Sequence, residues 1–136
     1  MALEREGMLA MERTWYRSSR PAPGRLSDEE RRRIEPVLKR YCEARVPPRF
    51  RDEIQVDYRI RGTTVTLFER RSAWRAPGEW TESSVAQFRY DPVTATWSLL
   101  CCDRHQRWHP YDRRPTKNLA SLLREVDADR SGIFWG

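Results

Sequence analysis

The spacing of apolar residues changes from a helical to a strand period near Pro47 and Pro48, and this change limits the folds open to the chain. Ahead of the prolines, apolar side chains recur every three or four residues, which is the spacing of one buried helix face. These residues are Ile34, Val37, Leu38, Tyr41 and Cys42. Behind the prolines, Ile54, Val56, Tyr58 and Ile60 alternate with polar residues, as in a half-buried strand. The sequence therefore predicts a helix followed by a sheet.

Turn signals and a second helical pattern complete the expected architecture. Ser27 with Glu30 three residues on is a capping-box signature for the start of the first helix. Short connections predict an antiparallel meander; its strands are expected near 54–61, 64–71, 84–90, 96–102 and 107–111. Helical spacing of apolar residues, preceded by Asn118, predicts a last helix at Leu119, Leu122, Leu123 and Val126. The prediction is an α+β fold, a five-stranded antiparallel meander with an N-terminal and a C-terminal helix on one face.

Residues 1–25 lack sustained periodicity and contain S-S-R-P-A-P-G-R, so we expect a flexible N-terminal tail. Residues 26–136 are then a single α+β domain. No apolar run approaches the roughly 18 residues of a transmembrane helix, and we expect no membrane association. The first residues are too acidic for a signal peptide, and three cysteines give no disulfide framework. We therefore expect a cytoplasmic protein.

The chain ends on S-G-I-F-W-G, although it has 34% charged residues. Three bulky apolar side chains at a free end are wasteful in water, so we expect Ile133, Phe134 and Trp135 to return to the domain. The preceding D-A-D-R-S-G resembles the first half of a calcium-binding loop. The carboxylate required at position twelve of such a loop is missing, so a helix-ending turn explains the same letters.

Positive charge is the main clue to a partner. The net charge is +6, and two of the 26 basic residues are lysines, which leaves 24 arginines. A GC-rich genome explains such an arginine bias without function, but arginine also suits phosphates and bases. Aromatic and arginine residues interleave, as in F-R-Y and R-W-H-P-Y, although Phe88, Trp97 and Trp108 can equally be core residues. The strand arginines that we expect to contact nucleic acid are Arg59, Arg61, Arg70, Arg71, Arg89 and Arg107.

The leading hypothesis is a non-catalytic nucleic-acid-binding module that uses an arginine and aromatic sheet face. The alternative is a protein-interaction adaptor or a homo-oligomeric assembly protein. A third hypothesis is a small metal-free ribonuclease, because Arg107, His109 and Tyr111 alternate on the fifth expected strand. The residues disclose no reaction, so we lean toward a protein that is not an enzyme.

Metal and nuclease patterns are weak. Cys102, His105 and His109 have a zinc-like spacing, but the adjacent Cys101 points to the opposite strand face and Cys42 is far along the chain. Asp57 and Glu69 form a possible carboxylate pair without the lysine that a nuclease motif needs. We predict neither a metal nor another cofactor.

Most of the chain resembles a bacterial family catalogued as domain of unknown function 3024. The matching stretches are L-F-E-R-R-S-A-W (67–74), E-W-T (79–81), V-A-Q-F-R-Y (85–90), the run 96–111 and the final G-I-F-W-G (132–136). The resemblance implies a single-domain intracellular bacterial protein. It implies no activity, and it carries over no catalytic residue.

Overall fold

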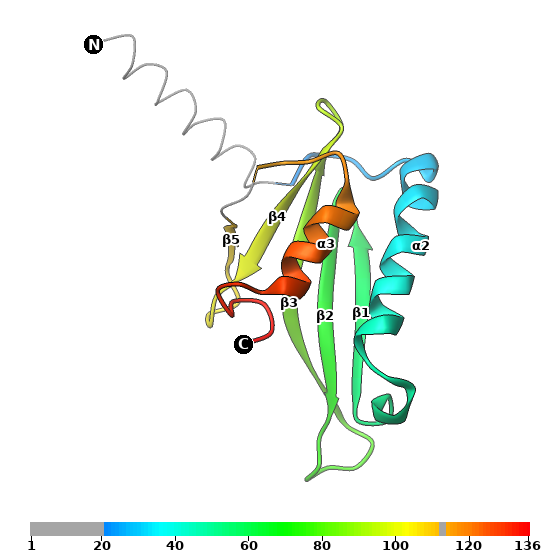
Figure 1. Ribbon diagram of the computed structural model, residues 1–136, viewed down its shortest axis with the longest axis vertical. Coiled ribbons are helices and arrows are strands. Elements are labelled where there is room, and N and C mark those ends of the chain that lie inside the picture. The colour runs from blue at the N-terminus through cyan, green and yellow to red at the C-terminus, as the bar shows by residue number, and fades with distance from the viewer. Residues whose placement is uncertain (1–20, 112–113) are drawn as a thin grey trace, which may run out of the picture.

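The computed structural model describes residues 21–111 and 114–136. Two helices, one 3-10 turn and five strands follow one another along this part of the chain (Figure 1). In order they are α2 (Asp28–Arg45), η1 (Pro48–Phe50), β1 (Ile54–Arg61), β2 (Thr64–Ser72), β3 (Trp80–Asp91), β4 (Thr96–Cys102), β5 (Trp108–Pro110) and α3 (Leu119–Ala128). The predicted order of elements is confirmed.

The five strands form one antiparallel sheet in the order β1-β2-β3-β4-β5, so every strand pairs with its neighbour in the sequence. The turn between β1 and β2 needs glycine, because Gly62 has φ 59° and an added Cβ would lie 2.9 Å from the carbonyl oxygen of Gly24. The last strand is shorter than expected. It begins at Trp108, because the backbone of Arg107 is engaged by the preceding turn.

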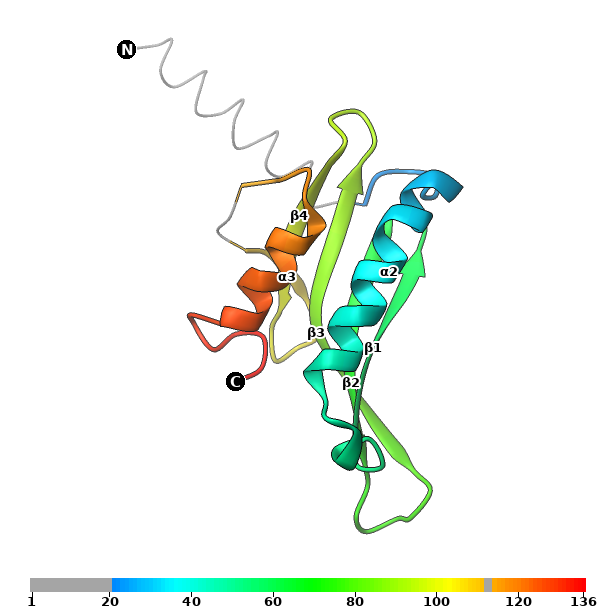
Figure 2. The same ribbon diagram turned by 45° about the vertical axis from the view of Figure 1, so that its right-hand side comes forward.

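Both helices cover the same face of the sheet (Figures 1 and 2). The N-cap Ser27 accepts a hydrogen bond from the Glu30 backbone N–H at 3.1 Å, and Asn118 caps α3 by accepting one from Ala120 N–H at 3.0 Å. The apolar stripe of α2 buries Ile34, Leu38 and Cys42, and α3 buries Leu119, Leu122, Leu123 and Val126. The predicted α+β fold with an antiparallel five-stranded sheet is confirmed.

Two of the three aromatic residues that the sequence could not assign to core or surface lie in the core between the helices and the sheet. Trp97 is 2% exposed and Phe88 is fully buried, and the Trp97 ring lies 4.9 Å from that of Tyr90. Trp108 is only half-buried, and its position opposite Cys102 places it on the other face of the sheet. Phe88 and Trp97 are therefore core residues and present no surface for stacking.

The C-terminal segment (residues 129–136) packs back onto the domain, as expected. Phe134 is 7% exposed, and its ring lies 5.0 Å from that of Tyr111. Asp129 ends α3 in the left-handed conformation (φ 43°) and accepts the backbone N–H groups of Phe134 and Trp135 at 3.0 and 2.9 Å. The guanidinium of Arg45 lies 4.1 Å from the Trp135 ring. Ile133, by contrast, remains 44% exposed.

The residues that resemble a calcium-binding loop (127–132) stabilise the fold through hydrogen bonds. Asp127 accepts hydrogen bonds from Tyr41 at 3.3 Å and from Arg45 at 3.2 Å, and Asp129 holds the C-terminal segment. At the other end of the chain, residues 1–20 of the expected tail lie outside the described residues. Residues 21–25 are described, and Ala22 accepts a hydrogen bond from the Thr63 hydroxyl at 2.8 Å.

Candidate nucleic-acid interface

The face of the sheet turned away from the helices carries four of the six predicted arginines. Val65 and Leu67 lie in the core, so the residues that alternate with them on β2 point away from the helices. The strand register extends this face from β2 to its neighbours on both sides. We call it the arginine face, and its arginines are Arg59, Arg61, Arg70 and Arg89.

Phe68 lies at the centre of the arginine face, and two arginine side chains lie over its ring. The guanidinium carbons of Arg59 and Arg70 lie 4.7 and 5.2 Å from its ring centroid, and the ring is only 3% exposed. Both arginines also approach the Glu82 carboxylate, at 3.2 and 3.7 Å. The ring and the carboxylate thus fix two planar cations side by side at the surface.

Arg89 is held more deeply on the same face. Its Nε donates to Gln87 at 2.9 Å, and the Gln87 amide donates in turn to the Thr66 hydroxyl at 3.2 Å. Burial lowers the pKa of Arg89, because desolvation disfavours the charged form. Its Nη1 and the neighbouring Thr64 hydroxyl are both buried without a hydrogen-bond partner in the structure. Arg89 therefore contributes charge to the face, but its Nη1 donor is not exposed to a ligand.

The two remaining predicted arginines lie elsewhere. Arg71 lies on β2 opposite Ile54, on the helix side of the sheet, and pairs with Glu69. Arg107 lies just before β5, in the same alternation as His109 and Tyr111. The same register separates Asp57 from Glu69, because Asp57 lies opposite Phe68 on the arginine face. These two carboxylates therefore do not form a common site.

The side chains of the weak catalytic candidates have different surroundings. The imidazole Nε2 of His109 lies 2.7 Å from an Asp103 carboxylate oxygen. Tyr111 is half-buried, and its ring packs on Phe134 in the core. Arg107 is exposed and uses its backbone N–H to bond Asp103 at 2.9 Å. The structure gives these three side chains no shared partner among the residues it describes.

The metal candidates are likewise engaged by the β4–β5 turn. The Cys102 thiol contacts the Asp103 carbonyl and the Gln106 amide oxygen, at 3.5 and 4.0 Å. His105 is exposed, and its backbone N–H donates to Asp103 at 2.8 Å. Within residues 21–111 and 114–136, no group of three or more His, Cys, Asp or Glu side chains could hold a metal ion.

Asp103 organises this turn, although the residues predicted from the sequence do not include it. Its carboxylate accepts the backbone N–H groups of His105 and Arg107 and also lies against His109. These interactions, with the Arg107 bond largest, lower the pKa of Asp103 to about 2. The signal was present in D-R-H-Q, because an aspartate that opens a tight turn bonds the backbone two residues on.

The lowered pKa of Asp103 leads to a testable prediction for stability in acid. Its pKa is lower in the folded chain than the ordinary value of 3.8, so its stabilising contribution is present above about pH 4. That contribution is lost as the pH falls from about 4 through about 2. In thermal melts across this range, the wild type should lose melting temperature more steeply than Asp103→Asn, which has no carboxylate to protonate. Parallel curves for the two proteins would contradict the assigned role.

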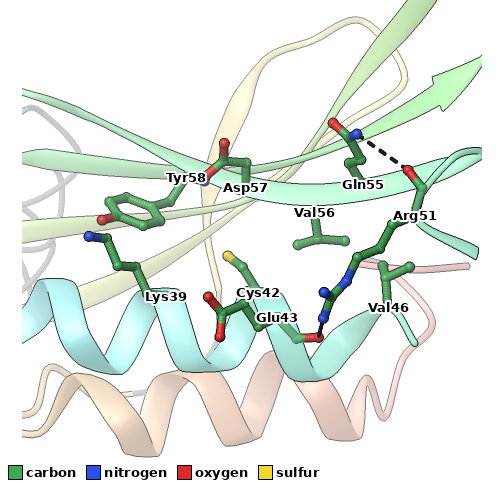
Figure 3. Close-up of a pocket in the computed structure, with 9 residues that line it drawn as sticks. All are labelled: Lys39, Cys42, Glu43, Val46, Arg51, Gln55, Val56, Asp57 and Tyr58. Carbon is green, nitrogen blue, oxygen red and sulfur yellow. Dashed lines mark hydrogen bonds between the residues drawn. The ribbon is translucent and has the colours of Figure 1, made fainter. Parts of the chain in front are cut away.

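A pocket of about 300 Å³ lies between α2 and the edge strand β1 (Figure 3). Cys42, Val46 and Val56 supply its apolar lining. Its charged and polar lining is Lys39, Glu43, Arg51, Gln55, Asp57 and Tyr58. Burial, together with the nearby Asp57 and Glu43 carboxylates, raises the pKa of Cys42 to about 12. The thiol is therefore protonated at neutral pH and is a poor nucleophile.

The sequence profile described as "Domain of unknown function (DUF3024)" matches residues 26–136 of the chain. Searches of curated proteins and of solved structures found no match. In the described part of the chain, no helix has the length and apolar character needed to cross a membrane.

Proposed function

Since the chain belongs to the DUF3024 family, whose description names no activity, we propose from its geometry that the arginine face binds nucleic acid. The observation that carries this proposal is the pair of guanidiniums from Arg59 and Arg70, spread over Phe68. Planar, permanently charged groups that are already ordered lose little conformational entropy when they bind a phosphate.

The charge balance of the face favours a polyanion. Four arginines share it with three carboxylates, Asp57, Glu82 and Asp91. Arg61 is exposed, and its side chain has no ion pair or hydrogen bond within residues 21–111 and 114–136. In this proposal Arg61 provides the first phosphate contact. Arg59 and Arg70 then donate some of their hydrogen bonds to backbone phosphates in place of Glu82.

The proposal is tested by the salt dependence of binding. A fluorescently labelled single strand of about 12 nucleotides should bind the full chain at low ionic strength. With about three phosphate contacts, log K should fall with log salt at a slope near −2. Affinity should therefore drop roughly tenfold or more between about 50 and 200 mM salt. Absence of binding at low salt, or binding insensitive to salt, would reject the proposal and favour a protein-interaction or assembly role.

A further inference from the structure

One end of the domain exposes three aromatic side chains, at Phe50, Trp74 and Trp80. Among the described residues, the other large exposed apolar side chains are Val93 and Ile133, which are not aromatic. Phe50 ends η1, Trp74 lies in the β2–β3 loop and Trp80 opens β3, at the lower end of the sheet in Figure 1. We call this region the aromatic end.

Trp74 is the most exposed of these three aromatic side chains. Its residue surface is 82% exposed, so its indole adds little to the core. The loop that carries it is ordered by backbone bonds: Ala73 N–H donates to Glu79 O at 2.9 Å, and Glu79 N–H donates to Ala76 O at 3.0 Å. The Arg75 guanidinium lies 4.7 Å from the indole. A planar ring is thus presented to solvent with a cation on it.

The aromatic end continues the arginine face. Trp80 lies opposite Ser72, two positions beyond Arg70 on the same side of β2, and is 40% exposed. On the other side of the end, Arg49 lies 4.9 Å from the ring of the 41% exposed Phe50. Trp80 therefore extends the arginine face toward the β2–β3 loop that carries Trp74 and Arg75.

We propose that the ligand of the arginine face is single-stranded nucleic acid, and that an unpaired base stacks on Trp74. This inference rests on the proposed function and names its substrate class. Arginines alone bind the phosphates of either a single strand or a duplex. An exposed indole adds affinity only when a base face is free, as in a single strand. The combination of arginine cations with exposed aromatic rings fits a flexible polyanion that carries planar bases.

The test compares three probes of about 12 nucleotides: oligo(dT), a duplex of equal length and an abasic strand. The wild type should bind oligo(dT) more tightly than the duplex. Trp74→Ala should weaken oligo(dT) binding by about tenfold, since it removes the stacking of one base. It should leave abasic binding within about twofold, because the phosphate contacts are unchanged. Trp74→Phe should retain most of the oligo(dT) affinity.

Because Trp74 is exposed, the alanine variant should melt at the wild-type temperature. Equal oligo(dT) affinity for Trp74→Ala and the wild type would overturn the stacking role and leave the proposed function standing. Equal losses on oligo(dT) and on the abasic strand would also overturn it, since no base is then involved. If the wild type binds none of the three probes, the proposed function itself fails.

Discussion

Replacing Phe134 by alanine is expected to lower the free energy of unfolding by about 3 kcal/mol. The ring is 7% exposed, packs on Tyr111 and belongs to the main core, so its removal leaves a cavity. For a domain of this size the melting temperature should fall by roughly 10 °C or more. Thermal or urea unfolding followed by circular dichroism measures the loss.

Ile133→Ala is the matched control. The two residues are neighbours in the C-terminal segment, but Ile133 is 44% exposed and lies outside the core cluster. Its substitution should change stability by less than about 0.5–1 kcal/mol. If both variants lose the same stability, the segment acts through something other than burial of the Phe134 ring.

Replacing Arg59, Arg61 and Arg70 together by alanine is expected to weaken oligonucleotide binding by about 100-fold at low salt. Each removed guanidinium takes away a charged contact to phosphate, and three such contacts account for a loss of this order. The slope of log K against log salt should become shallower by about 2, at roughly 0.7 per phosphate contact. Titration by fluorescence anisotropy at several salt concentrations measures both quantities.

The control removes the same number of charges from the helix side. Arg32, Arg40 and Arg124 are exposed on α2 and α3, away from the arginine face. Their triple alanine variant has the same net charge as the first, yet should bind within about threefold of the wild type. Equal losses in the two variants would mean that overall charge, and no particular face, drives binding. Thermal unfolding of each variant checks that exposing the Phe68 ring does not destabilise the sheet.

The fold was readable because its local signals agree with its packing. Ser27 and Asn118 cap the helices where the sequence indicates, and the alternation around Val56 and Leu67 selects the buried side of each strand. Short turns then leave a meander as the simplest topology, since each strand can pair with the next. The return of Phe134 to the core was also predictable, because a polar chain has little reason to end on exposed rings.

The candidate site was only partly readable. Arg70 and Arg71 are neighbours on one strand, so they cannot share a face, yet both were predicted to bind. The partition became clear only from the register, which places Arg70 with Phe68 and Arg71 with Glu69. The irregular pairing of β2 with β3 between Leu67 and Phe68 also escaped prediction. It lets the adjacent Val85 and Ala86 both enter the core and sets which later residues of β3 reach the arginine face.

The contact between Arg45 and Trp135 has a kinetic consequence. It joins residues 90 positions apart (135 − 45), whereas the strand pairs form between neighbouring segments. Closing so long a loop is entropically costly, so the hairpins should assemble before the chain end docks. A contact made after the rate-limiting barrier slows escape from the native state and does not speed its formation. The C-terminal segment should therefore lower the unfolding rate and have little effect on the folding rate.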